Sequence, residues 1–172
     1  TILLAGTASI ASASFVHQSN FFVNPSDPTG IHGIASDGSN FYLGSFDSGV
    51  SKRDGAFVES ALFANPGSGQ IRGVGYDASS GSLLVGNYSS GDVYRLGTAG
   101  SLMDTMSLFG ASQMNAVGAD GNTGNFFTLG FAGLFQYHMS DGTLISSFNT
   151  GTQLTGLAVD DVNQSILILT ST

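Results

Sequence analysis

Several residue types are missing or scarce in this chain of 172 residues. It contains no cysteine, no tryptophan and only 3 prolines, and its 4 basic residues face 12 acidic ones, for a formal net charge of −8. Without cysteine, the chain cannot form disulfides, thiolate metal sites or cysteine nucleophiles. Because nucleic-acid binding needs Lys and Arg to neutralise phosphates, the charge balance argues against nucleic acid and against an anionic membrane surface.

Long hydrophobic stretches are also missing. No apolar run approaches the roughly 18 residues of a membrane span, so no membrane insertion is expected. Residues 2–6, followed by Ala11-Ser12-Ala13, are similar to the apolar region and the A-x-A cleavage site of a signal peptide. No initiator Met or basic region precedes them, and two interpretations of residues 1–13 remain: an export signal, or a strand of the folded protein.

What the chain does contain favours strands and tight turns. Hydrophobic residues make up 41%, with 13 Phe and 5 Tyr, so a real core can form. Only 9% of the residues are charged, and the polarity comes from Ser, Thr, Asn, Gln and 25 glycines. This composition is typical of a secreted or cell-surface protein, and we expect an extracellular location.

A short phrase recurs four times. Residues 31–37 read IHGIASD, residues 71–77 IRGVGYD, residues 114–120 MNAVGAD and residues 154–160 LTGLAVD. The closing aspartates lie 40, 43 and 40 residues apart. Self-similarity at such a period is the signature of a repeat architecture.

The same sequence of turns and strands follows each phrase. An Asp- or Asn-rich turn leads to an apolar strand, a Gly/Ser turn to a third strand, and a second turn such as Asp54-Gly55 or Asp141-Gly142 to a fourth. Four short antiparallel strands in about forty residues are the pattern of a propeller blade. Residues 101–114 also have helical spacing, but their place in the repeat favours an outer strand. The prediction is an all-β single domain over residues 1–172, a β-propeller or an open array of about four four-stranded blades, with breaks near residues 30, 70, 113 and 153.

The strand count is uneven. Residues 2–6 match the second strand and residues 15–25 the fourth, which gives four first, five second, four third and four fourth strands. The surplus second strand, residues 166–169, either displaces or pairs with residues 2–6 or pairs with another molecule, since a free strand edge offers unpaired N–H and C=O groups. Alternatively, the chain is part of a longer propeller. The candidate assembly residues are Ile2, Leu3, Leu4, Ile166, Leu167, Ile168 and Leu169.

The phrase G-x-A-x-D resembles the inner strands of NHL-repeat propellers and of gluconolactonase-like, calcium-dependent propellers. It is intact at residues 33–37 and 156–160 and departs by one or two residues at 73–77 and 116–120. The resemblance implies a propeller fold and, in its lactonase-like branch, a metal held by acidic residues at the channel mouth. That implication makes Asp37, Asp77, Asp120 and Asp160 candidate ligands for Ca²⁺, although an Asp that closes a strand also suits a structural turn. The lactonase-like families also use a Glu near the start of the propeller, whereas the single Glu here, Glu59, falls on a predicted outer strand.

Other chemistry is sparse. The histidines His17, His32 and His138 occupy different repeat positions and do not predict a shared metal site, although His32 is placed to line the channel. Asn87 and Asn163 each begin an N-x-S sequon for glycosylation. No G-x-S-x-G elbow or phosphate-binding glycine loop occurs.

These observations favour a non-enzymatic, extracellular structural or binding module without a cofactor, which assembles into a multimer or fibre by strand exchange between copies. Two alternatives remain. One is a metal-dependent, lactonase-like hydrolase with its site at the channel mouth. The other is a glycan-binding propeller that uses exposed tyrosines as stacking platforms, with four candidates: Tyr42, Tyr88, Tyr94 and Tyr137.

Overall fold

The structure is a computed structural model that describes residues 30–111, 113–131, 133–149, 154–160 and 163–170. Every regular element in these ranges is a β-strand, and no helix in them is long and apolar enough to cross a membrane. The strands are β1 Ile31–Ser36, β2 Phe41–Ser45, β3 Gly49–Arg53, β4 Glu59–Phe63, β5 Ile71–Asp77, β6 Ser82–Asn87, β7 Asp92–Gly97, β8 Leu102–Ser107, β9 Ala116–Asp120, β10 Asn125–Gly130, β11 Gly133–His138, β12 Leu144–Phe148, β13 Leu154–Asp160 and β14 Ser165–Thr170.

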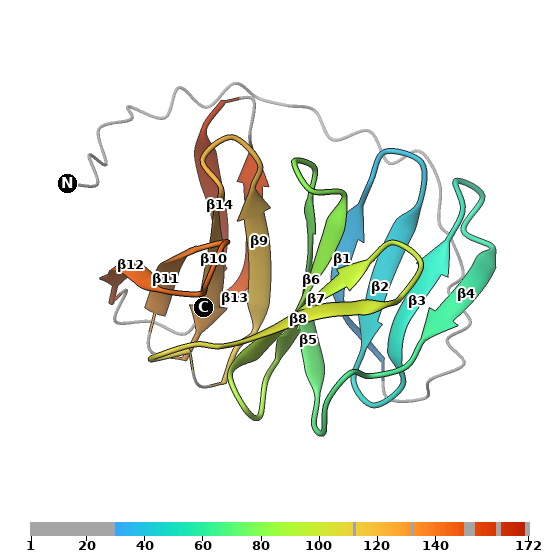
Figure 1. Ribbon diagram of the computed structural model, residues 1–172, viewed down its shortest axis with the longest axis horizontal. Coiled ribbons are helices and arrows are strands. Elements are labelled where there is room, and N and C mark those ends of the chain that lie inside the picture. Colours follow the sequence, from blue (N-terminus) through green and yellow to red (C-terminus); the bar gives the residue numbers. More distant parts are fainter. Residues whose placement is uncertain (1–29, 112, 132, 150–153, 161–162, 171–172) are drawn as a thin grey trace.

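The strands form successive antiparallel sheets, one per repeat. Three sheets have four strands in simple chain order, β1 to β4, β5 to β8 and β9 to β12, and β13 pairs with β14 in a fourth, two-stranded sheet. Figure 1 shows the sheets following one another across the molecule, from β1 to β4 in blue and cyan to β13 and β14 in red. The predicted all-β, blade-like architecture is confirmed.

The repeated phrase forms the first strand of each sheet. β1 lies against β5, β5 against β9, and β9 against β13, so the four phrases run side by side through the centre of the array. The third phrase position is small because backbones meet there: a Cβ added at Gly33 would lie 2.7 Å from the Val74 nitrogen, and one at Gly73 would lie 2.7 Å from the Val117 nitrogen. The close approach of neighbouring sheets therefore explains the glycine in the phrase.

The hydrophobic core lies between sheets rather than inside one. One cluster joins the first and second sheets through residues such as Tyr42, Val50 and Ile71. A second cluster joins the second and third sheets, and a smaller one, with Leu129 and Leu154, joins the third sheet to β13. Each sheet is thus stabilised mainly by its neighbours, as in other repeat architectures.

The outer strands settle one ambiguity of the sequence. Residues 101–114, whose spacing also fits a helix, contain the strand β8, which pairs with β7 from Asp92 and Ser107 onward. Position in the repeat predicted this strand correctly, because cross-strand pairing outweighs local helical spacing. The strands predicted at residues 2–6 and 15–25 lie outside the described residues.

Candidate functional site

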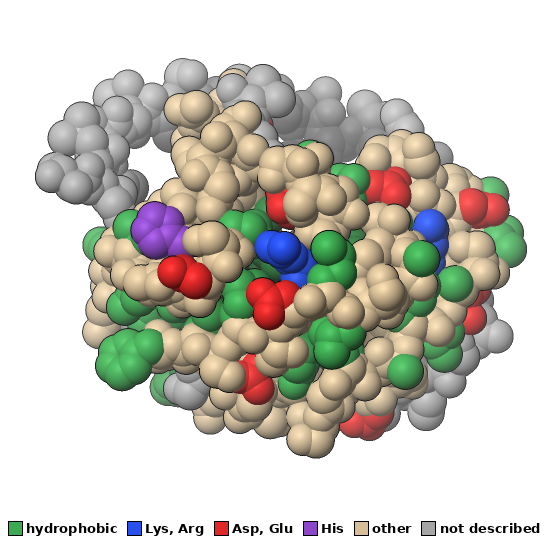
Figure 2. Space-filling view, viewed as in Figure 1, with side chains coloured by type: hydrophobic (Ala, Val, Ile, Leu, Met, Phe, Trp, Pro, Cys, Tyr) green, Lys and Arg blue, Asp and Glu red, His purple; other side chains and the backbone are tan. Residues whose placement is uncertain are grey.

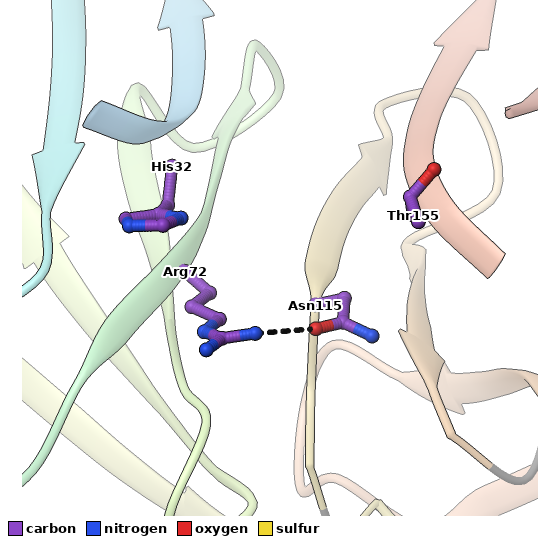
Figure 3. Close-up of a pocket in the computed structure, with 4 residues that line it drawn as sticks. All are labelled: His32, Arg72, Asn115 and Thr155. Atoms are coloured by element: carbon purple, nitrogen blue, oxygen red, sulfur yellow. Dashed lines mark hydrogen bonds between the residues drawn. The ribbon is translucent and has the colours of Figure 1, made fainter. Parts of the chain in front are cut away.

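The second position of the four phrases forms one site. His32, Arg72, Asn115 and Thr155 come from β1, β5, the turn before β9, and β13, and together they line a hollow of about 220 Å³ at one end of the inner strands. Figure 3 shows the Arg72 guanidinium between His32 and Asn115, with Thr155 on the far side. Four polar side chains separated by about forty residues each therefore meet because the phrases lie side by side.

Two aromatic rings hold Arg72 in place. Its guanidinium carbon lies 3.9 Å from the centre of the Tyr88 ring and 5.6 Å from that of Phe46. The rings follow β6 and β2 directly, and backbone hydrogen bonds from Tyr88 to the Gln70 carbonyl and from Ile71 to the Phe46 carbonyl tie them to the start of β5. Stacking of this kind fixes the plane of a guanidinium and leaves its N–H edge for polar contacts.

Hydrogen bonds link the site across the sheets. Arg72 Nη1 donates to Asn115 Oδ1 at 3.2 Å, and Asn115 Nδ2 donates to the Leu154 carbonyl at 3.3 Å. Thr155 Oγ1 donates to the Leu169 carbonyl at 3.3 Å, which leaves its oxygen free to accept from a ligand. The site therefore presents donors on one side and an acceptor on the other.

Sequence reasoning identified His32 as a channel residue but missed the other three. The signal was available in the second column of the phrase, which reads His, Arg, Asn and Thr while the first column is apolar throughout. A polar position at the same place in every repeat faces the shared axis, so reading the phrase by columns finds the site.

The aspartates that close the phrases lie at the opposite end of the same strands. Asp37 Oδ1 accepts from the Ser39 and Asn40 backbone nitrogens at 2.8 and 2.6 Å, and its Oδ2 accepts from Tyr42 at 2.7 Å. The other three carboxylates also accept hydrogen bonds within their own turns: Asp77 from Ser79 and Ser80, Asp120 from Asn122 and Thr123, and Asp160 from Asn163. Each is an Asx-type turn of the kind that its sequence position suits.

These hydrogen bonds shift the acidity of two carboxyls. Burial raises the pKa of Asp37, but donors from Asn40, Tyr42 and Ser39 outweigh burial and hold that pKa well below its usual range. At Asp77, burial also raises the pKa, and hydrogen bonds from Ser79 and Ser80 lower it further than burial lifts it. Both groups are thus stabilised in the charged form by turn donors.

The predicted Ca²⁺ ligands remain a prediction. Among the described residues, no three His, Cys, Asp or Glu side chains gather closely enough to hold a metal ion. Glu59 does lie on an outer strand, β4, where its carboxylate pairs with Arg53 at 3.2 Å and accepts from Ser51 at 2.8 Å. The carboxylates thus have protein partners, which suits structural roles.

The two sequons differ in exposure. Asn87 is fully buried, its Nδ2 donates to the Ser68 carbonyl at 2.8 Å, and its Oδ1 accepts from the Ser89 and Ser90 nitrogens. A glycan on Nδ2 would displace this contact and the packing around it, so the folded structure argues against Asn87 as an acceptor. Asn163 is exposed and stays a candidate.

The expectation of exposed tyrosine platforms is wrong for three of the four residues. Tyr42, Tyr94 and Tyr137 are buried in the inter-sheet clusters, where large rings fill the space between blades. Burial also raises the pKa of Tyr137 to about 12. Tyr88 is half-buried, and its ring is covered by Arg72. A glycan site therefore cannot be built on these four rings together.

The candidate assembly strand at the end of the chain has an open edge. β14 pairs with β13 and, within the described residues, with no other strand, whereas β2, β6 and β10 each lie between two partners. Its side chains Leu167 and Leu169 are 64% and 66% exposed, and Ile168 is 38% exposed. Ile166 is half-buried, and Ile2, Leu3 and Leu4 lie outside the described residues.

The comparisons with known proteins concern the fold. No family model and no curated protein sequence matches this chain. A crystal structure of Myxococcus xanthus glutaminyl cyclase, itself a propeller, matches with a TM-score of 0.63 and 16% sequence identity, over 82% of this chain and 68% of that one. This likeness shows the fold alone. It supports the propeller-like arrangement and leaves the chemistry of the site to be argued from the residues.

Proposed function

We propose that this chain is a non-enzymatic, extracellular binding module that assembles with further copies of itself by adding strand to strand at β14. The observation that supports this proposal is the edge of β14 that no other described strand pairs with in the two-stranded sheet. A sheet edge presents unpaired N–H and C=O groups in a row, which is a template for another strand. Strand addition of this kind needs no catalytic group.

The chemistry of β14 suits a partner of the same kind. Residues 163–170 contain no Lys, Arg, Asp, Glu or Pro, the residues that protect exposed edges from pairing. Two copies of a chain with a net charge of −8 repel one another, and on the face seen in Figure 2 the acidic side chains are spread out rather than gathered in one patch. An uncharged strand is therefore a place where two copies can approach.

Antiparallel pairing of two β14 strands also covers part of what one copy leaves exposed. Leu167 and Leu169 lie on the same face of β14, whereas Leu84 and Val85 on the equivalent strand β6 are fully buried by strands and sheets on all sides. Covering exposed leucines contributes about 1.5–3 kcal/mol for each side chain that becomes fully buried. Each leucine that pairing covers therefore favours association, against the cost of bringing two molecules together.

The experiment is a light-scattering measurement of mass against protein concentration for the wild type and the double variant Leu167→Lys/Leu169→Lys. The wild type is expected to gain mass with concentration, and the variant is expected to stay monomeric because like charges would oppose each other across the paired edge. The matched control, Leu102→Lys/Met103→Lys, changes two residues on β8 that are 52% and 54% exposed, and it should associate like the wild type. A monodisperse wild-type monomer at all concentrations contradicts the proposal, as does equal loss of association in the control.

A further inference from the structure

Arg72 is a cation without a counter-ion among the described residues. No carboxylate there lies within ion-pair distance of it, although the chain has 12 acidic residues and 4 basic ones. Its only hydrogen bond to a described residue is the one from Nη1 to Asn115, and its buried Nε has no acceptor. A half-buried charge is usually paired, because removing it from water costs free energy that a partner offsets.

We propose that the hollow lined by His32, Arg72, Asn115 and Thr155 binds a small organic carboxylate that carries a hydroxyl group next to its carboxyl. The guanidinium plane is fixed by Tyr88 and Phe46, so its remaining N–H groups form a prepared fork for a planar carboxylate. This site does not depend on pairing between copies at β14, although Thr155 Oγ1 bonds to the backbone carbonyl of Leu169 on that strand.

The lining residues select among anions. One guanidinium matches a single negative charge, whereas a phosphate dianion would sit beside one cation in a chain with a net charge of −8. The imidazole of His32 is exposed at the rim and can donate one N–H to the anion. Thr155 Oγ1 already donates to Leu169, so its free lone pairs accept from a hydroxyl on the ligand. The volume of about 220 Å³ accommodates only a small molecule.

The inter-strand hydrogen bonds also explain why the site is ready before the ligand arrives. Asn115 holds Nη1 of Arg72 and is itself held by the Leu154 carbonyl, so the guanidinium cannot swing out of the hollow without breaking a contact. Ordering a long arginine side chain costs up to about 2 kcal/mol of conformational free energy. Stacking on Tyr88 and the hydrogen bond to Asn115 offset this cost already in the free protein. Preorganisation of this kind raises affinity for a small ligand.

The test is a titration of the ¹⁵N-labelled chain with lactate, followed by the amide resonances of residues 72, 115 and 155. Saturable shifts at these positions are expected, with none on titration with lactate methyl ester, which keeps the hydroxyl group but carries no charge. Arg72→Gln should weaken binding at least about tenfold, because a charge-assisted hydrogen bond pair is lost. The matched control Arg95→Gln removes another half-buried arginine, on β7, and should bind like the wild type.

A second variant keeps the result interpretable if Arg72→Gln fails to fold. Asn115→Asp places a carboxylate where Arg72 Nη1 already makes its contact, so an internal ion pair should compete with the ligand and abolish the shifts while the fold persists. Equal lactate affinity in the wild type and both variants overturns the proposal, and so does the absence of shifts at these residues in the wild type. The titration is also carried out on the Leu167→Lys/Leu169→Lys variant, which is expected to stay monomeric. Lactate binding by this variant is therefore measured separately from assembly at β14, so that failure of one proposal is distinguished from failure of the other.

Discussion

The hydroxyl of Tyr42 donates a hydrogen bond of 2.7 Å to Oδ2 of Asp37, from the first residues of β2 back to the turn that precedes it. Tyr42 is fully buried in the cluster between the first two sheets. The bond therefore connects a turn at one end of the inner strands to the core. Among the described residues, the hydrogen bonds to Asp77 and Asp120 come from Ser, Thr and Asn groups of their own turns and not from a tyrosine.

We expect a double-mutant cycle of Tyr42→Phe and Asp37→Asn to show a coupling free energy of about 1.5–3 kcal/mol at neutral pH, the range for hydrogen bonds to charged groups. Urea unfolding of the wild type, the two single variants and the double variant measures it. Asp104→Asn, at an exposed position on strand β8, is the control: the Asn oxygen can still accept from the Thr105 nitrogen, so the free energy of unfolding should change by less than about 0.5 kcal/mol. A cycle with no coupling would show that the contact adds nothing to stability.

The same carboxyl should make stability depend on pH in the acid range. The pKa of Asp37 is lower in the folded chain than in the unfolded one, where it is about 3.9. Its contribution to stability is therefore complete above the unfolded pKa and is lost as the pH falls toward the folded pKa. The stability difference between wild type and Asp37→Asn should shrink as the pH drops below about 4, in unfolding curves measured from neutral to acid pH. A difference that stays constant through this range contradicts the assignment.

The close approach of the inner strands predicts a penalty for one methyl group. An added Cβ at Gly73 would lie 2.7 Å from the Val117 nitrogen and 2.9 Å from the Ala116 carbonyl carbon, both backbone atoms that cannot turn aside. Gly73→Ala should lower the free energy of unfolding by about 1–3 kcal/mol through overpacking. Gly55→Ala, where a Cβ meets nothing within 4 Å, is the control and should be neutral or slightly stabilising. Equal stabilities of the two variants would contradict the prediction, because they would show that the inner strands of neighbouring sheets move apart at no cost to make room for a methyl group.

The buried side-chain amide of Asn87 predicts that the two sequon asparagines contribute unequally to stability. Asn87→Ala would leave the Ser68 carbonyl and the Ser89 and Ser90 nitrogens without their partner, and we expect a loss of at least about 2 kcal/mol. Asn163→Ala, at the other sequon, removes one exposed turn contact and should cost about 0.5–1 kcal/mol. Thermal unfolding of both variants checks the order, which would be reversed if Asn87 were a solvent-facing residue.

Much of the fold follows from local signals in the sequence. The turns Asp37 to Asn40 and Asp77 to Gly81 predicted where strands end, because Asp and Asn bond to nearby backbone and glycine adopts positive φ, as at Gly38 (87°) and Gly81 (64°). The period of the phrase then predicted which strands share a sheet. Strands β5 and β13 have the bounds of the phrases at residues 71–77 and 154–160.

The site was less predictable, because it depends on contacts between repeats. Nothing local to Arg72 shows that Tyr88, sixteen residues later, will cover its guanidinium, or that Asn115 from the next phrase will accept its hydrogen bond. The prediction that the tyrosines are exposed was wrong for a related reason. A half-buried strand pattern does not show which face of the strand packs against the next blade. Tyr42 and Tyr137 therefore entered the core although a surface role suited their chemistry equally well.

The distribution of the core has a consequence for how the molecule comes apart. Among the described residues, the first two inter-sheet clusters contain nine and ten buried residues, and the one that holds β13 contains three. In a linear array whose units are held only by their neighbours, opening begins at the unit with the weakest junction. Of the four described sheets, the β13–β14 hairpin should therefore exchange its amide hydrogens first and fray while the three larger sheets stay closed, so that the edge on which assembly is proposed also belongs to the sheet that opens most easily.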